Sequence, residues 1–199
     1  MIEKKPVEAR KVVPFRIVPN TPGGLGVYVN SSIDNPDGAE ISGEFSTLLL
    51  PNIRVESGSV YAVEGTKAIS MLLTGHVPKG VDLTEMYIEK ELAAQGLGTY
   101  YLKVGDVSDH IDVSWAKMGT LDLTLSTYCP SLDMRRGIFD TLDFGYDVNR
   151  KVRGLDLRST TIKNVEGVLP ADTSDIQMDK NTNVPENLRA YLKRMSAVI

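Results

Sequence analysis

The sequence predicts an α+β fold, in which an antiparallel twisted sheet, or a sheet pair, packs with one central helix and a C-terminal amphipathic helix. Three observations lead to this fold. Segments with apolar residues at every second position recur between short turn signals, one central segment has the start and stop signals of a helix, and the last residues repeat apolar side chains at helical spacing. The 199 residues are 42% hydrophobic and 24% charged, which is typical of a globular chain with a sizeable core.

The first 24 residues predict an extended, proline-rich N-terminal arm, followed by a single globular domain over residues 25–199. Proline removes a backbone donor and disfavours helix in the residue before it. The apolar side chains between the prolines could dock on a neighbouring subunit, with a tail that has no fixed structure as the alternative. The residues expected to make this self-association contact are Val12, Val13, Pro14, Phe15, Ile17, Val18 and Pro19.

Strands are expected on both sides of the central helix. In the segment 117–129, Leu121, Leu123 and Leu125 alternate with polar side chains, which predicts a strand with one buried face. Turn residues separate the expected strands at short intervals, and this spacing favours antiparallel pairing. We identify no internal repeat or low-complexity tract in the sequence.

The central helix is expected to begin at Asp82. This residue can cap the helix while Glu85 reaches back in the pattern of a capping box, and Gly96 suits a left-handed end. A second helix is expected to begin at Pro185, with apolar residues on one face and basic residues on the other. It could lie on an acidic membrane surface, occupy a partner's groove or cover its own sheet. Its expected contact residues are Leu188, Arg189, Tyr191, Leu192, Lys193, Arg194 and Met195.

Basic side chains gather in two regions although the chain has a formal net charge of −4. One group lies in the N-terminal arm, and the other follows the strands of the middle of the chain. Such groups could bind phosphates on lipid or nucleic acid, or an acidic protein face, with a solvated surface as the alternative. The expected basic contact residues are Lys4, Lys5, Arg10, Lys11, Arg135, Arg136, Arg150, Lys151, Arg153, Arg158 and Lys163.

The sequence predicts no catalytic, cofactor-binding or metal-ligating residues, and hence no enzyme. Asp109 and Asp112 flank His110, but a metal site needs three or four converging ligands and no second cluster is evident. The glycines at 22–26 lack the Gly-Lys-Ser/Thr of a phosphate loop and are expected to form a turn. The single cysteine, Cys129, is expected to be buried or half-buried. The alternative is an uncharacterised enzyme in which these acidic, histidine and cysteine side chains meet.

Location can also be predicted from the chain. No apolar run approaches the roughly 18–20 residues that cross a bilayer, and no apolar stretch follows the positive charges at the N-terminus. One cysteine cannot make an internal disulfide framework. We therefore expect a protein that is not secreted, has no transmembrane segment and works in a reducing compartment.

Three stretches resemble, in order and spacing, the core of rhabdovirus matrix proteins. They are ISGEFS at 41–46, KAISMLLTGHVPKGVDLTEMYIEKEL at 67–92 and HIDVSWAKMGTLDLTLSTYC at 110–129. In that family a strand ends in a small residue and a glycine, passes a proline-glycine turn and leads into an amphipathic segment. A later tryptophan-bearing strand precedes one with alternating leucine or isoleucine. The similarity extends over residues 41–136 and lies in this pattern, with few shared identities.

The resemblance implies a viral matrix protein, a structural component of the virion that self-associates into homo-oligomers and bridges the nucleocapsid and the inner face of the envelope. Its implied location is the virion and the host cytoplasm, peripheral to an anionic membrane, with nucleic acid bound at most non-specifically. The Pro-Pro-x-Tyr and Pro-Thr/Ser-Ala-Pro motifs that serve budding in this family are missing from the chain. The structural alternative is a coat-protein-like β-sandwich that encloses a genome.

Overall fold

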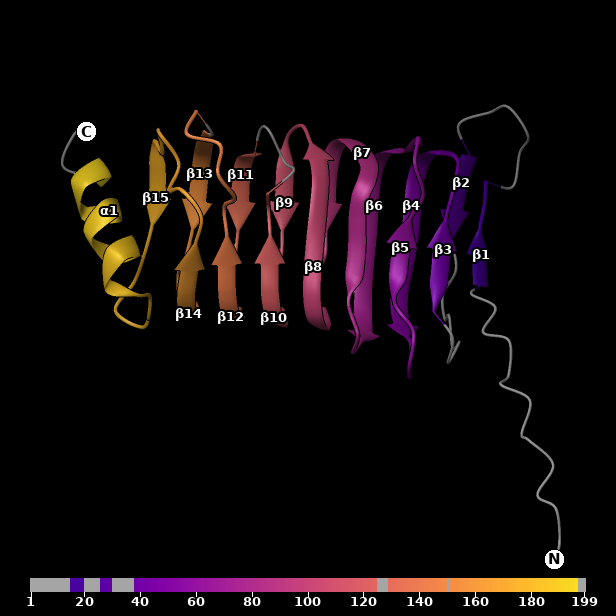
Figure 1. Ribbon diagram of the computed structural model, residues 1–199, viewed down its shortest axis with the longest axis horizontal. Helices are drawn as coiled ribbons and strands as arrows, with labels where there is room; N and C mark the ends of the chain where they lie inside the picture. Colours follow the sequence, from indigo (N-terminus) through magenta and orange to yellow (C-terminus); the bar gives the residue numbers. More distant parts are fainter. Residues whose placement is uncertain (1–14, 20–25, 30–37, 125–128, 150, 197–199) are drawn as a thin grey trace, which may run out of the picture.

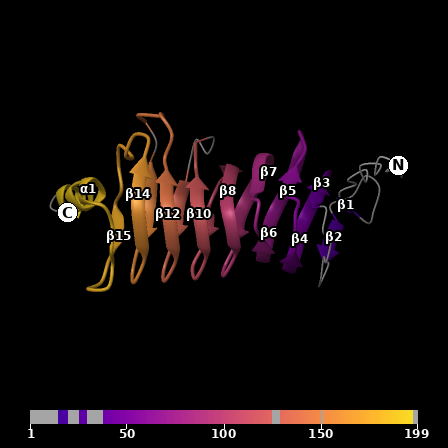
Figure 2. The same ribbon diagram turned by 60° about the horizontal axis from the view of Figure 1, so that its bottom comes forward.

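The computed structural model describes residues 15–19, 26–29, 38–124, 129–149 and 151–196. They form a β-solenoid, in which the chain winds in successive coils around one long axis and each coil pairs with the next (Figures 1 and 2). The strands are β1 (Phe15–Ile17), β2 (Gly26–Val29), β3 (Ala39–Ile41), β4 (Glu44–Arg54), β5 (Val60–Ala62), β6 (Thr66–Val77), β7 (Val81–Ala93), β8 (Gly98–Val107), β9 (His110–Asp112), β10 (Lys117–Asp122), β11 (Cys129–Asp133), β12 (Ile138–Asp143), β13 (Val152–Asp156), β14 (Thr161–Glu166) and β15 (Asp175–Gln177), and the helix is α1 (Glu186–Ser196).

The strands alternate between two rows that run along the solenoid. β8, β10, β12 and β14 pair in this order in one row, and β7, β9, β11, β13 and β15 pair in the other. Towards the N-terminus the first row continues through β7 to β5, β3 and β1, and the second continues through β6 to β4 and β2. β7 belongs to both rows because its two ends pair with different strands. As a result, β1 and β2 lie at one end of the rod and α1 lies at the other (Figure 1).

The core consists of apolar columns that follow the solenoid axis. Residues opposite one another on neighbouring strands point to the same face of the sheet, so apolar positions stack from coil to coil. One column contains Leu92, Ile111, Leu132 and Leu155, none of which is more than 2% exposed. A leucine or isoleucine side chain contributes roughly 1.5–3 kcal/mol when it leaves water completely. These columns therefore hold successive coils together.

An internal repeat marks the corners of the coils, so the expectation of no repeat was wrong. Each repeat is an aspartate between two buried apolar residues, and its carboxylate accepts a hydrogen bond from the N–H two residues later. The repeats lie 21 or 23 residues apart, in the range of solenoid repeats, except that 40 residues separate 81 from 121, where the intervening coil has Lys103 opposite Asp82 and Asp122. The repeats are 81–83, 121–123 and 142–144 at one corner and 111–113, 132–134 and 155–157 at the other.

The expectation of antiparallel pairing was also wrong, because every strand pair in the described ranges is parallel. The alternating segments are strands, as the period of two indicates. However, the short turns between them are corners within a coil, and each strand finds its partner one whole coil further along the chain. Turn spacing alone cannot distinguish these two arrangements.

The central helix is absent, since residues 81–93 form strand β7. A register shift between Leu83 and Tyr87 interrupts the two-residue alternation, so the buried residues change phase from Val81 and Leu83 to Met86 and Ile88. The Asp82 carboxylate bonds Thr84 at a corner rather than capping a helix. Gly96 does have the expected left-handed conformation, with φ of 64°, but it turns the coil after β7.

The C-terminal amphipathic helix is confirmed as α1. Leu188, Tyr191 and Leu192 are buried while Lys193 and Arg194 are exposed, and the Tyr191 hydroxyl lies 2.7 Å from that of Thr173. Of the outcomes left open by the sequence, this helix covers its own domain, at the C-terminal end of the solenoid (Figure 1). Within the described segments we find no helix with the length and apolarity that a bilayer crossing requires.

Candidate functional site

Three consecutive coils turn at the same corner, which begins with Asp112, Asp133 and Asp156. The register places these aspartates opposite one another. Each carboxylate fixes its turn by accepting the backbone N–H two residues later, so the corner repeats with the same geometry. These bonds run from Ser114 to Asp112 (2.8 Å), from Arg135 to Asp133 (3.0 Å) and from Arg158 to Asp156 (3.1 Å).

The third residue after each of these aspartates has a left-handed backbone conformation. Trp115, Arg136 and Ser159 have φ of 60°, 59° and 59°, a conformation that disfavours residues with a Cβ atom. The surrounding ladder compensates, because the Trp115 N–H donates to the Arg135 carbonyl (2.8 Å) and the Arg136 N–H to the Arg158 carbonyl (3.0 Å). The corner therefore displays its side chains in rows that run along the solenoid.

Two arginines in these rows cover the carboxylates beneath them. Arg135 Nη2 lies 2.5 Å from Asp133 Oδ2, and its Nε lies 3.5 Å from Asp156 Oδ2 on the next coil. Arg158 Nη2 lies 2.6 Å from the same Asp156 oxygen. The side chains of Arg135 and Arg158 are each 46% exposed, whereas those of Asp133 and Asp156 are only 11% and 16% exposed. Although the formal charges nearly balance, the surface presents the positive groups.

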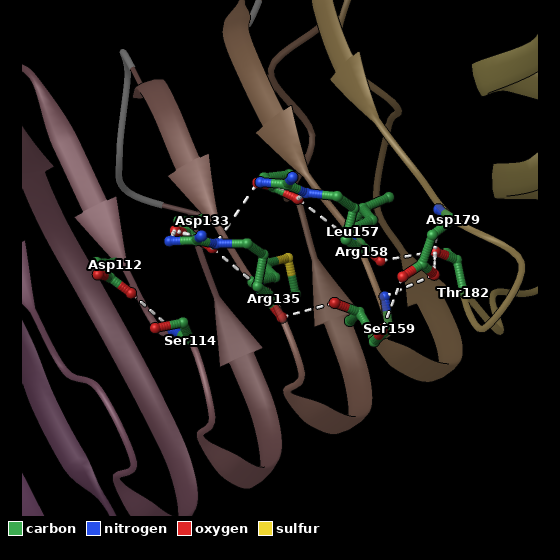
Figure 3. Close-up of polar contacts among 12 residues, drawn as sticks. Asp112, Ser114, Asp133, Arg135, Leu157, Arg158, Ser159, Asp179 and Thr182 are labelled. Carbon is green, nitrogen blue, oxygen red and sulfur yellow. Dashed lines mark hydrogen bonds and ion pairs between the residues drawn. The ribbon is translucent and has the colours of Figure 1, made fainter.

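The ion pairs also stabilise the charged forms of the two arginines. Hydrogen bonding to Asp133, reinforced by its charge, raises the pKa of Arg135, and Asp156 raises the pKa of Arg158 in the same way. Figure 3 shows the two arginine side chains on consecutive coils, with Ser114 towards one end and Asp179 towards the other.

Arg136 differs from its two neighbours because it stacks on a ring. Its guanidinium carbon lies 4.4 Å from the centre of the Trp115 ring, well within the range of a cation–π contact. Trp115 is 60% exposed, which is unusual for so large an apolar side chain. We find no ion pair for the Arg136 guanidinium in the described part of the chain. This cation is therefore held in place without being neutralised.

We name this surface the arginine corner. It encloses a hollow of about 380 Å³. At its C-terminal limit the Asp179 carboxylate accepts hydrogen bonds from the Ser159 N–H (2.9 Å) and hydroxyl (2.7 Å), which lower the pKa of Asp179 to about 2. The arginine corner consists of Trp115, Arg135, Arg136, Arg158, Ser159 and Asp179.

The structure divides the expected basic contact residues among several places. Arg135, Arg136 and Arg158 come together at the arginine corner. Lys163 lies elsewhere, 2.6 Å from Asp140 beside a second hollow of about 530 Å³ that also includes Tyr100. Lys151 precedes β13 and Arg153 lies within it. The members outside the described residues are Lys4, Lys5, Arg10, Lys11 and Arg150.

Trp115, Ser159 and Asp179 were missed by the sequence interpretation. The repeated apolar-Asp-apolar tripeptides contain the signal that could have found two of them, because these tripeptides align Trp115, Arg136 and Ser159 at one position of the corner. Asp179 carries no such signal, since the coil before α1 lacks the tripeptide. Its role follows only from its hydrogen bonds to Ser159.

The N-terminal end of the solenoid contains part of the expected self-association arm. Phe15 and Ile17 belong to β1, where Ile17 is fully buried and Phe15 is 39% exposed. Val18, which follows the strand, is 48% exposed, and Pro19 is half-buried. Val12, Val13 and Pro14 lie outside the described residues. Whether these residues mediate self-association stays a prediction.

Of the side chains considered for catalysis, His110 lines a hollow of about 150 Å³ together with Asp133, Asp156 and Asp175. His76 is exposed and His110 half-buried, on β6 and β9. Cys129 begins β11, opposite Val152. No group of three His, Cys, Asp or Glu side chains in the described ranges is arranged to hold a metal ion.

Comparison with family models, with curated proteins and with solved structures gives no match for this chain. The resemblance to rhabdovirus matrix proteins stays a prediction from the sequence.

Proposed function

We propose that this protein is a non-enzymatic structural protein of matrix type, which assembles with copies of itself through the N-terminal end of the solenoid. The observation that carries the proposal is the difference between the two ends of the rod. At the C-terminal end, α1 buries Leu188, Tyr191 and Leu192 against the last coil. At the N-terminal end, β1 pairs with β3 and β2 pairs with β4, and each has one paired side in the described residues.

Strand β1 shows which backbone groups face outwards. The Phe15 N–H donates to the Gly38 carbonyl (2.9 Å), and the Ile17 carbonyl accepts from the Ser42 N–H (3.0 Å). Successive residues of a strand direct their backbone groups to opposite sides, so the N–H and C=O of Arg16 point away from β3. An outward edge of this kind is a template for pairing with another strand.

The closed C-terminal end restricts how copies can meet. Head-to-tail stacking would bring the open edge of one copy against α1 of the next, which lies beyond β15 at the C-terminal end (Figure 1). Contact between two N-terminal ends gives a two-fold pair in which both copies use the same surface, the commonest symmetry of oligomers. A paired rod with a capped end on each side is the unit that the geometry favours.

Other parts of the matrix-type proposal have different support. That the protein is not an enzyme stays a prediction from the sequence. Contacts with a nucleocapsid and with an anionic membrane rest on the resemblance and on the basic side chains. Location in a virion rests on the resemblance alone.

The substitution Arg16→Pro tests the proposed pairing. Proline removes the outward N–H of residue 16 but leaves the inward bonds of Phe15 and Ile17 in place, and edge strands tolerate proline at such a position. We expect the wild-type chain to form a dimer in sedimentation equilibrium as its concentration rises, and Arg16→Pro to remain a monomer with an unchanged circular dichroism spectrum.

Arg16→Ala is the matched control. It removes the contact of Arg16 Nε with Glu40 Oε1 (3.5 Å) but retains the backbone N–H, so it should dimerise like the wild type. A wild-type chain that stays monomeric at all concentrations would contradict the proposal. So would a folded Arg16→Pro variant that dimerises with undiminished affinity.

A further inference from the structure

We propose that the arginine corner binds an acidic saccharide, meaning a sugar ring that carries a carboxylate or sulfate group. This inference goes beyond the proposed assembly, because the corner lies on the side of the rod and shares no residue with the N-terminal edge. It rests on three features of the corner, namely its outward guanidinium groups, its exposed indole ring and its limited length.

The guanidinium groups provide the donors that an oxyanion requires. Arginine has five N–H donors in a planar fork. Arg135 and Arg158 use one edge of the fork for the carboxylates beneath them, which leaves the remaining donors directed towards solvent. Arg136 has its ring contact with Trp115 and no ion pair in the described residues. An anion that enters the hollow therefore meets three positive groups already held in position, and little ordering is needed on binding.

The indole ring of Trp115 provides an apolar platform beside these donors. Its 60% exposure leaves a large ring area open to a ligand, and a tryptophan loses little conformational freedom on binding because it has only two side-chain torsions. The C–H face of a sugar ring can pack on the indole while its acidic group reaches the arginines. The hollow of about 380 Å³ lies in the size range of small-ligand sites.

The length of the corner argues against two other polyanionic partners. Asp112 precedes the arginines and Asp179 follows them, so the positive stretch extends over about two coils, or roughly 10 Å. A nucleic-acid backbone that continued along the corner would meet carboxylates on both sides, and one aromatic ring is few for stacking successive bases. Anionic membranes select clusters of about four to eight basic residues. A single acidic sugar unit matches the length of the corner best.

Trp115 is the single tryptophan of the chain, so its fluorescence reports directly on this surface. We would titrate the full chain with D-glucuronate and with D-glucose 6-sulfate, using D-glucose at the same concentrations as the uncharged counterpart. Acetate and inorganic sulfate supply the same charges without a sugar ring. We expect a saturable change in emission with one or both acidic sugars, and no saturable change with glucose, acetate or sulfate over the same range.

Arg136→Asn removes the stacked guanidinium and suits the left-handed backbone, which asparagine tolerates better than most residues. It should weaken binding of the acidic sugar roughly tenfold or more, the usual effect of losing a hydrogen bond to a charged group. Lys163→Gln is the matched control, because it removes one positive charge from the same half of the solenoid but outside the arginine corner. This control should bind like the wild type, and thermal unfolding should show that both variants are folded.

Three results would overturn the inference. One is the absence of a saturable change with either acidic sugar. Another is equal affinity for acetate or sulfate, which would make the corner an anion site without preference for a sugar. The third is tighter binding of short oligothymidylate, or of vesicles that contain phosphatidylserine, than of the acidic sugars. None of these results depends on dimer formation, so the failure of this inference and of the proposed assembly can be told apart.

Discussion

At the scale of single residues, the aspartates and their partners determine how each coil turns. Asp112, Asp133 and Asp156 each fix a corner through a local hydrogen bond, and the ladder then holds Trp115 and Arg136 in left-handed conformations. The sequence indicated the basic character of part of this surface. It did not indicate which basic residues would meet, because that depends on which coil lies beside which.

A test at this scale concerns Asp179. Its pKa is about 2 in the folded chain, below the ordinary value of 3.8, because Ser159 donates two hydrogen bonds to the charged form. A carboxylate with a lowered folded-state pKa stabilises the fold above its unfolded pKa and loses this effect as the pH falls from about 4 to about 2. We expect Asp179→Asn to lower the Tm at pH 6 and to differ less from the wild type at pH 2.

The matched control is Asp175→Asn, which changes an exposed carboxylate on β15 of the same region. It should shift the Tm less than Asp179→Asn at pH 6. A Tm difference between Asp179→Asn and the wild type that is constant from pH 6 to pH 2 would contradict the assigned role of Ser159. Differential scanning calorimetry across this pH range provides the measurement.

At the scale of elements, period and helix amphipathicity were reliable guides while pairing was not. Alternation correctly indicated the strand at Leu121, but β10 ends at Asp122 and Leu123 lies at the corner that follows. Helical spacing correctly indicated α1. The segment 81–93 was mistaken for a helix because Asp82 and Gly96, which can start and stop a helix, also suit the turns of a coil. Partner strands could not be predicted, because alternation within a strand contains no information about whether the next strand or the next coil lies beside it.

The helix α1 is expected to act as the cap of the C-terminal end. Leu192→Asp would place a charge among buried apolar side chains and should loosen α1 from the last coil. We expect a lower Tm and larger species in light scattering, because the strand edges and apolar columns of this end become accessible. Lys193→Asp, which introduces the same residue at the neighbouring exposed position, should leave both observations close to those of the wild type. A monodisperse Leu192→Asp variant with unchanged Tm would exclude a capping role.

At the scale of the whole molecule, the protein is a rod with one capped end, one end formed by edge strands, and a basic corner along its side (Figure 1). The α+β prediction was wrong at this scale because the repeat is carried by three residues per corner, with irregular spacing and few identities. The rod accounts for the alternating strands and for the single terminal helix. It also separates the surface proposed for assembly from the surface proposed for ligand binding.

Hydrogen–deuterium exchange of the full chain at low and high protein concentration tests the central claim most directly. Backbone amides that pair between copies exchange more slowly when copies associate. The account predicts that protection of peptides containing β1 and β2 rises with concentration, while protection of α1 and of the arginine corner stays constant. Protection that is independent of concentration at β1 and β2, or that rises at α1 instead, would contradict assembly through the N-terminal end.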